Sequence, residues 1–326
     1  MWYPPTTIDM LEHRFTKLVA FATFLLLVIG GTVNATGSSL ACPEPTILCN
    51  DEFFPTMTGG VLYEHGHRLA AETVGILQLI LTVLLIRRRP QLKWLAWLLL
   101  GMIAVQATLG ALTVYYLLPW YISTGHLLLG MTYFATLVYT ALLTRPAPSV
   151  VELQQHDRRR AELGSARRWI LLAVATLLVQ LLLGALVRHL GAAMVCLGMP
   201  TCTMGGDWWP EAPVQHLHML HRAFGVVVGI VTTVAAIQIW RAAKSWSGLR
   251  LIALIAPVLV GGQIVLGIYT VMTLRSVPVA VGHFAGAVSL WALWLSALFL
   301  TRARVGATGV IHEQQPANRL SKAVMS

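Results

Sequence analysis

Long apolar runs separated by short polar segments make up most of the chain. A helix needs about 20 mainly apolar residues to cross the hydrocarbon core of a bilayer. Runs of this kind occur at residues 18–33, 69–86, 94–116, 120–144, 169–187, 223–240, 251–272 and 279–301. The pattern predicts an all-α integral membrane protein with eight transmembrane helices.

The composition agrees with this prediction and narrows the class of protein. Hydrophobic residues make up 56% of the chain and charged residues 11%, and the mean hydropathy is +0.70. Soluble proteins carry roughly 25% charged residues, so the lipid bilayer is the expected surrounding. The net charge of +10 alone would suit binding to nucleic acid. The charges, however, lie in short clusters between apolar runs, which argues against nucleic acid as a partner.

Basic residues are concentrated at the two ends of the chain and in every second connection between apolar runs. The dense clusters lie within residues 14–17, 87–93, 145–168, 241–250 and 302–322. Because such clusters stay on the cytoplasmic side, both termini of this multi-pass protein of the plasma membrane are expected in the cytoplasm. The first run resembles a signal peptide, but no convincing cleavage site follows it, so we interpret it as a retained helix.

All four cysteines fall in the two long connections predicted on the outer side, Cys42 and Cys49 in the first and Cys196 and Cys202 in the second. The outer side is oxidising, so each pair is a candidate for a disulfide within its loop. Such a bond can staple the loop or take part in redox chemistry, and the sequence leaves both roles open.

The chain repeats itself. A shift of 154 residues places Cys42 on Cys196, Glu64 on His218, His67 on His221 and Arg68 on Arg222. A shift of 157 residues places Gln106 on Gln263, Gly110 on Gly267 and His126 on His283. The repeat predicts two four-helix halves, 1–150 and 151–326, joined by a polar linker at 145–168. Since four spans return the chain to its starting side, we expect a pseudo-two-fold axis along the membrane normal.

Histidines are the chemically distinctive residues of the predicted helices. The chain has 11 of them, and eight lie at or near outer helix ends: His65, His67, His126, His189, His216, His218, His221 and His283. A single such histidine can simply reach the headgroup region, but a position kept in both halves favours function. His67 opens the second helix and His126 lies just inside the fourth, so their imidazoles can face each other, and His221 and His283 repeat this arrangement. Two facing imidazoles in a helical bundle indicate bis-histidine heme ligation. A zinc site built from His216, His218 and His221 is the alternative.

Two further features surround these histidines. Arg68 and Arg222 each follow a ligand candidate directly, and each is expected either to bind heme propionates or to anchor the helix at the outer edge of the membrane. Glu64 lies one helical turn before His67, on the same face if the helix extends that far, whereas the second half has His218 there. A carboxylate beside a porphyrin can move protons or stabilise positive charge, so we expect a reactive first half and a holding second half.

These residues together resemble the bacterial heme A synthase family. The resemblance rests on Thr-Gly-Ser-Ser-Leu-Ala-Cys-Pro at 36–43, Cys49, Glu64-x-x-His67-Arg68, His126, His221-Arg222 and His283. It covers nearly all of the chain, including the eight-helix repeat. The resemblance implies an oxidoreductase that converts the C8 methyl group of heme O to a formyl group, giving heme A for terminal oxidases.

The resemblance also implies roles for individual residues. His221 and His283 would hold the iron of a heme b cofactor, and His67 and His126 would hold the substrate heme O. Glu64 would be catalytic, and the loop cysteines would pass reducing equivalents or stabilise the loop. The expected chemistry is two successive hydroxylations of one methyl, followed by loss of water from the gem-diol. A farnesyltransferase that makes heme O and an electron donor are the expected partners.

Three other functions remain open at this stage. A bis-histidine membrane cytochrome would pass electrons to or from quinone without modifying heme. Such a protein would have no need for the difference between Glu64 in the first half and His218 in the second. A transporter with parallel repeats would need charged or broken helices near mid-membrane, which the sequence does not clearly contain. A heme exporter or chaperone would bind porphyrin without changing it.

Overall fold

The computed structural model describes residues 10–145, 163–244 and 247–302, and this part contains eight helices long and apolar enough to cross a membrane. They are α1 (Leu11–Ala35), α2 (Gly59–Arg88), α3 (Lys93–Tyr115), α4 (Trp120–Leu143), α6 (Ala166–His189), α7 (Pro213–Ala242), α8 (Ser247–Met272) and α9 (Val277–Arg302). The prediction of an all-α, multi-pass membrane protein is confirmed. Most of the predicted linker at 145–168 and nearly all of the basic C-terminal tail lie outside the described residues.

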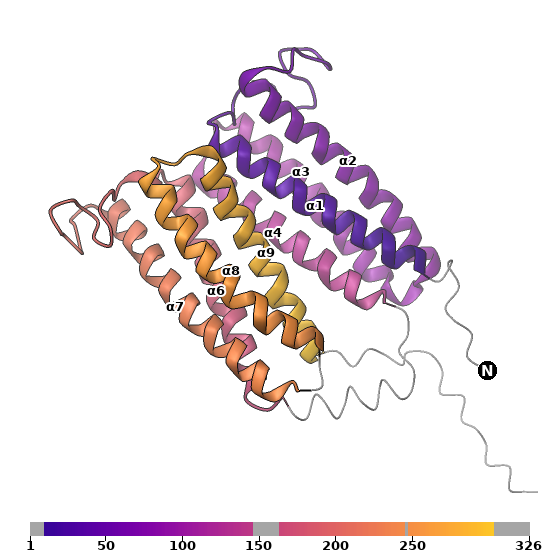
Figure 1. Cartoon of the computed structure of the whole chain (residues 1–326). Coiled ribbons are helices and arrows are strands. Elements are labelled where there is room, and N and C mark those ends of the chain that lie inside the picture. Colours follow the sequence, from indigo (N-terminus) through magenta and orange to yellow (C-terminus); the bar gives the residue numbers. More distant parts are fainter. Residues whose placement is uncertain (1–9, 146–162, 245–246, 303–326) are drawn as a thin grey trace, which may run out of the picture.

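The helices pack as two adjacent groups of four (Figure 1). In the first group α1 packs on α2, α2 on α3, α3 on α4, and α4 back on α1. In the second group α6, α7, α8 and α9 close a ring in the same order. The two groups meet through α1 with α9, α4 with α9, and α4 with α6. Helices α2 and α4 are therefore diagonal partners in one bundle, as are α7 and α9 in the other.

Two helices extend about ten residues beyond their predicted outer ends. The second and sixth apolar runs start at residues 69 and 223, but α2 begins at Gly59 and α7 at Pro213. The extra turns contain the polar residues around Glu64 and His218, which lower the hydropathy but are compatible with a helix because the outer loops bind their side chains. At 3.6 residues per turn, His67 and His221 lie about two turns inside their helices, so the expectation that His67 opens its helix was wrong.

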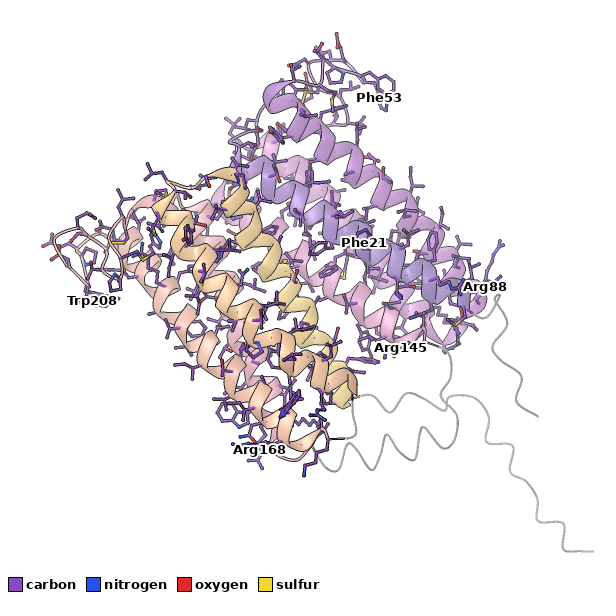
Figure 2. All side chains as sticks on the ribbon, in the orientation of Figure 1. Phe21, Phe53, Arg88, Arg145, Arg168 and Trp208 are labelled. Carbon is purple, nitrogen blue, oxygen red and sulfur yellow. A yellow bond between two sulfur atoms is a disulfide. The ribbon has the colours of Figure 1, made fainter. Side chains whose placement is uncertain are left out.

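The outer surface of the bundle is apolar, as lipid requires. Phe21 on α1 is 59% exposed and points outward from the side of the molecule in Figure 2. The labelled arginines Arg88, Arg145 and Arg168 lie at the end of the bundle opposite to Phe53 and Trp208 (Figure 2). The two ends of the bundle therefore differ in character: one is basic, and the other carries the two long loops.

The two long loops, between α1 and α2 and between α6 and α7, lie at the same end of the molecule (Figure 1). Each contains a disulfide, Cys42–Cys49 in the first and Cys196–Cys202 in the second, which confirms the predicted pairing. Each loop leaves its helix through a glycine with positive φ, +70° at Gly37 and +68° at Gly191. Glycine adopts this left-handed conformation without steric penalty, which ends the helix sharply.

Candidate functional site

Four histidines lie on the diagonal helices of the two bundles. His67 is on α2 and His126 on α4, and their imidazoles are close enough to interact electrostatically. His221 on α7 and His283 on α9 form the second interacting pair. The structure therefore brings together, within each half, the two histidines that the sequence paired.

Each of these rings packs on a glycine of a neighbouring helix. A Cβ atom added to the glycine would lie close to Cε1 of the ring: 2.9 Å for Gly30 and His67, 3.2 Å for Gly110 and His126, 3.2 Å for Gly184 and His221, and 3.3 Å for Gly267 and His283. Any side chain at these four positions would push on an imidazole. Gly30 and Gly184 were not identified from the sequence, although the same shift of 154 residues relates them.

The surroundings of the rings leave one nitrogen of each ring available to a ligand. All four side chains are half-buried, and their Nδ1 atoms are fully buried without a hydrogen-bond partner. The Nε2 atoms of these four rings are not among the fully buried, unpaired atoms, so Nε2 is the nitrogen of each ring that a ligand can reach. Only a long contact, 3.4 Å from Gln106 Nε2 to His126 Nε2, involves one of these atoms. Paired imidazoles with accessible Nε2 atoms inside an apolar bundle fit the two axial ligands of a heme iron.

Glu64 lies in α2, one turn before His67, so the helix does extend far enough to include it. Its side chain is buried, and its two carboxylate oxygens accept hydrogen bonds, one from α2 and one from the first loop. Arg68 Nη2 donates to Oε1 at 2.7 Å, and the backbone N–H of Cys42 donates to Oε2 at 2.9 Å. The carboxylate therefore connects the turn that carries His67 with the disulfide.

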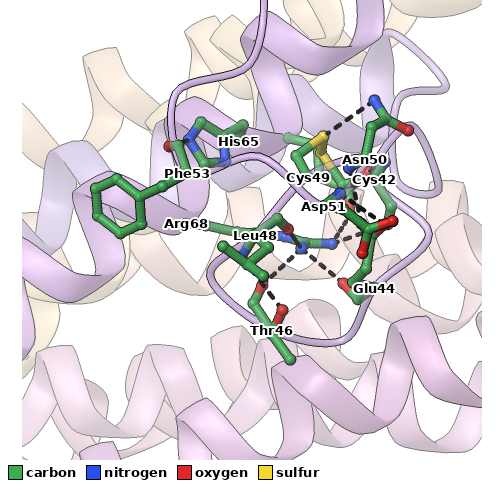
Figure 3. The surroundings of a disulfide bond; sticks show 11 residues. Cys42, Glu44, Thr46, Leu48, Cys49, Asn50, Asp51, Phe53, His65 and Arg68 are labelled. Atoms are coloured by element: carbon green, nitrogen blue, oxygen red, sulfur yellow. Dashed lines mark hydrogen bonds and ion pairs between the residues drawn. A yellow bond between two sulfur atoms is a disulfide. The ribbon is translucent and has the colours of Figure 1, made fainter.

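Arg68 binds the backbone of the disulfide loop (Figure 3). Its Nη1 donates to the carbonyls of Glu44, Thr46 and Leu48 at 2.6, 2.6 and 2.7 Å. Its Nη2 donates to the carbonyl of Cys42 at 2.9 Å. The loop thus wraps its carbonyls around one guanidinium, and this role was not predicted from the sequence.

Arg222 does the same in the second half. It donates to the carbonyls of Cys196 at 2.6 Å, Gly198 at 2.8 Å and Thr201 at 3.1 Å. Both arginines therefore use most of their donors on loop carbonyls. Propionate binding by these two residues stays a prediction, and it would have to compete with the loops.

The remaining outer histidines do not form a metal site. His216 stacks on Trp209, with ring centroids 4.4 Å apart, and its Nε2 contacts the carbonyl of Pro210. His65 is fully buried and its Nε2 lies 3.1 Å from the carbonyl of Phe53. In the described part of the chain no three His, Cys, Asp or Glu side chains come together to hold a metal ion. The zinc alternative therefore has no support in the structure.

Comparisons with known proteins identify the family. Residues 56–295 match the model of the COX15-CtaA family, described as cytochrome oxidase assembly protein. A heme A synthase of Macrococcus caseolyticus is 27% identical over 303 residues, covering 90% of this chain and 94% of that protein. Heme A synthases of Bacillus licheniformis and Lysinibacillus sphaericus are 25% and 28% identical and cover 82% and 84% of this chain and 88% and 91% of their own lengths. All four paired histidines lie inside the matched segment, whereas the first disulfide precedes it. The chain belongs to the COX15-CtaA family of cytochrome oxidase assembly proteins.

Proposed function

We propose that this protein is a heme A synthase, a membrane oxidoreductase that converts the C8 methyl group of heme O to a formyl group. The observation that carries the proposal is the pair of half-buried histidines on diagonal helices of each bundle, each ring seated on a glycine. The match to the COX15-CtaA family and to heme A synthases over most of their length supports the same reading. The product, heme A, would serve terminal oxidases.

The two bundles are proposed to be repeats, 1–150 and 151–326, related by a pseudo-two-fold axis along the membrane normal. The backbone supports this: Leu117 and Leu118 have positive φ in the turn before α4, and Leu274 and Arg275 have it in the turn before α9, at the shift of 157 residues. The packing of α1 on α9 and of α4 on α6 is what such an axis would produce, with α4 and α9 in contact at the axis.

The two halves are proposed to bind different hemes, one a cofactor and the other the substrate. His221 and His283 would hold heme b, which supplies one-electron redox chemistry when bound. His67 and His126 would hold heme O and fix the porphyrin plane, with Gly30 and Gly110 setting how near each ring lies to its helix neighbour. The apolar walls would keep water away from the substrate methyl and so limit side reactions.

Glu64 is the proposed catalytic carboxylate because the first half has it and the second half has His218 at the equivalent position. It is 4% exposed, and Arg68 Nη2 lies 2.7 Å from its Oε1. Conversion of the methyl to a formyl group, in two hydroxylations followed by loss of water from the gem-diol, removes four electrons from the carbon. An oxidant such as dioxygen must accept these electrons, and Glu64 would move the protons that the hydroxylations take up or release.

The orientation and the partners complete the proposal. Both termini would lie in the cytoplasm, since the basic end of the bundle is opposite to the two disulfide loops (Figure 2). The protein would sit in the plasma membrane, receive heme O from the farnesyltransferase that makes it, and depend on an electron donor.

Two substitutions test these assignments. His283→Ala should remove the low-spin heme spectrum of the purified protein, whereas Glu64→Gln should keep that spectrum and stop heme A formation. His216→Ala, which alters a histidine stacked on Trp209 outside the paired sites, is the control and should change neither. An unchanged spectrum in His283→Ala would overturn the ligand assignment, and a normal yield of heme A in Glu64→Gln would remove Glu64 from the mechanism. A bis-histidine cytochrome, the alternative function, would show the spectrum but form no heme A.

A further inference from the structure

Arg188, in the last turn of α6, is a cation at the boundary between the two bundles, and it has no acidic partner among the described residues. Its Nη2 makes two long contacts across that boundary, 3.4 Å to the carbonyl of Gly30 and 3.3 Å to that of Gly31 on α1. Its Nε is buried and has no hydrogen-bond partner. Its guanidinium carbon lies 5.3 Å from the centre of the Phe284 ring on α9. Weak carbonyl contacts and one orphan donor leave this guanidinium with unused binding capacity.

A second arginine lies beside it. Arg275, in the turn between α8 and α9, donates to the backbone carbonyl of Asn34 at 2.7 Å and to the Asn34 side chain at 3.2 Å, and it interacts electrostatically with Arg188. The ion pairs of the described residues join Glu64 to Arg68 and Glu12 to Arg89, so neither Arg188 nor Arg275 pairs with a carboxylate within the described part of the chain. Two like charges side by side at the outer end of this boundary, with no anion among the described residues, are unfavourable unless a ligand supplies the negative charge.

The position of Arg188 relates it to both histidine pairs. Gly30, whose carbonyl it contacts, is the glycine on which the His67 ring is seated. Phe284, over which it lies, directly follows His283. One turn earlier on α6, Gly184 seats the ring of His221. The guanidinium thus contacts a residue next to a candidate iron ligand in each half: Gly30, which packs on His67, and Phe284, which follows His283.

We propose that Arg188 and Arg275 form an anion site that binds the carboxylate groups of a porphyrin held by the paired histidines. The inference rests on the proposed function, because it takes the ligand to be a heme. Guanidinium groups bind carboxylates through paired, charge-assisted hydrogen bonds. Arg68 and Arg222, the arginines that the sequence favoured for this role, direct their donors at loop carbonyls instead.

A purely structural role is the competing explanation. A cation near the last carbonyls of α1 stabilises that helix end, which would account for the contacts with Gly30 and Gly31. It would not account for the second arginine beside Arg188. The two explanations differ in what they predict for the bound heme.

The test is a redox titration of the heme in the purified full-length protein, comparing wild type with Arg188→Gln and Arg188→Lys. Loss of a positive charge beside the porphyrin should favour the ferric form of the heme. Arg188→Gln should therefore lower the ratio of ferrous to ferric heme at a given potential by about tenfold, which is a decrease in midpoint potential of roughly 59 mV for a one-electron couple. Arg188→Lys keeps the charge and should shift this ratio by less than about threefold. The matched control is Arg250→Gln, which removes a guanidinium stacked 4.0 Å from the Trp240 ring at the opposite end of the bundle, and it should shift the ratio by less than about twofold.

A second measurement reports on the carboxylates directly. Membranes containing the protein from heme-limited cells are reconstituted with protoheme or with protoheme dimethyl ester, in which both carboxylates are masked. Wild type should bind protoheme about tenfold more tightly than the ester, and Arg188→Gln should lose most of that preference because an ionic hydrogen bond is worth about 1.5–3 kcal/mol, which is roughly tenfold or more in affinity.

The outcomes separate the inference from the proposed function. A heme whose potential and ester preference are the same in wild type and Arg188→Gln would overturn the inference alone. An equal shift in Arg188→Gln and Arg250→Gln would also overturn it, because the effect would then be unspecific. If Arg188→Gln does not accumulate in membranes, Arg275→Gln is judged by the same criteria. Wild-type protein without any low-spin heme would overturn the proposed function, and the anion site with it.

Discussion

Replacing Gly267 by alanine is expected to weaken heme binding in the second half without unfolding the bundle. The new Cβ would lie 3.3 Å from Cε1 of His283, tighter than ordinary van der Waals contact, so the imidazole must move by a few tenths of an ångström. Forcing an added methyl into a packed site costs about 1–3 kcal/mol. Since His283 is a proposed iron ligand, this strain should fall on heme ligation.

The same substitution five residues earlier provides the control. Gly262 is on the same helix and exposed, and a Cβ there would meet nothing within 4 Å. In an exposed helix interior alanine is favoured over glycine by about 1 kcal/mol, so Gly262→Ala should be neutral or slightly stabilising. The difference between the two variants therefore isolates the contact with the imidazole from the change in helix propensity.

The assay is heme loss from purified protein to a scavenging apoprotein, followed by the low-spin absorption bands. Gly267→Ala should retain heme about tenfold less well than Gly262→Ala, since 1.4 kcal/mol corresponds to a factor of ten. Gly184→Ala should reproduce the effect, because its Cβ would lie 3.2 Å from Cε1 of His221. Equal heme retention in Gly267→Ala and Gly262→Ala would refute the idea that these glycines seat the ligands.

Three further predictions concern the outer loops. Replacing Cys42 and Cys49 together with Ser should lower heme A formation more than it lowers the yield of folded protein, because the Cys42 N–H holds the Glu64 carboxylate; equal activity would favour a simple loop staple. Arg222→Gln should release the second loop, since charge-assisted hydrogen bonds contribute about 1.5–3 kcal/mol each, and limited proteolysis should then cut between Cys196 and Cys202 faster than in wild type; unchanged cleavage would contradict the clamp. Burial raises the pKa of Glu44, but its hydrogen bonds from the backbone N–H groups of Glu44, Asn50 and Asp51, with Arg68 nearby, lower it by more, so the pKa lies below 4.5. A lowered folded-state pKa means that Glu44 stabilises the first loop above pH 4.5 and that this contribution is lost as the pH falls through the lower, folded-state pKa. The protection of the loop amides from hydrogen exchange, relative to an unfolded peptide at the same pH, should therefore fall in that acid window in wild type; a Glu44→Gln variant with the same pH dependence would count against it.

The spans could be predicted from the sequence because lipid imposes a strong, simple requirement on them. Hydropathy located all eight helices, and the histidines that the repeat led us to pair lie on α2 with α4 and on α7 with α9. Hydropathy failed at the outer ends of α2 and α7, where polar side chains bind the loops instead of facing lipid. Helix ends of this kind depend on tertiary contacts that no local pattern contains.

The arginines show a different limit of sequence reasoning. Arg68 and Arg222 were expected to contact either a porphyrin or the membrane edge, whereas in the structure their guanidinium groups donate hydrogen bonds to carbonyls of the disulfide loops. Carbonyl groups occur at every residue, so their convergence on one guanidinium leaves no mark in the sequence. Arg188 is the converse case: its local sequence does not distinguish it, and only the packing of α1, α6 and α9 places it beside both histidine pairs.

The most direct test of the account is the pigment content of cells that make heme O, grown with and without this protein. Hemes are extracted, separated by chromatography and identified by mass. The account predicts that heme A appears at the expense of heme O only when the protein is present, and that His67→Ala and His126→Ala prevent its appearance. Heme O that persists unchanged in cells containing folded, heme-bearing wild-type protein would contradict the claim that this chain oxidises it.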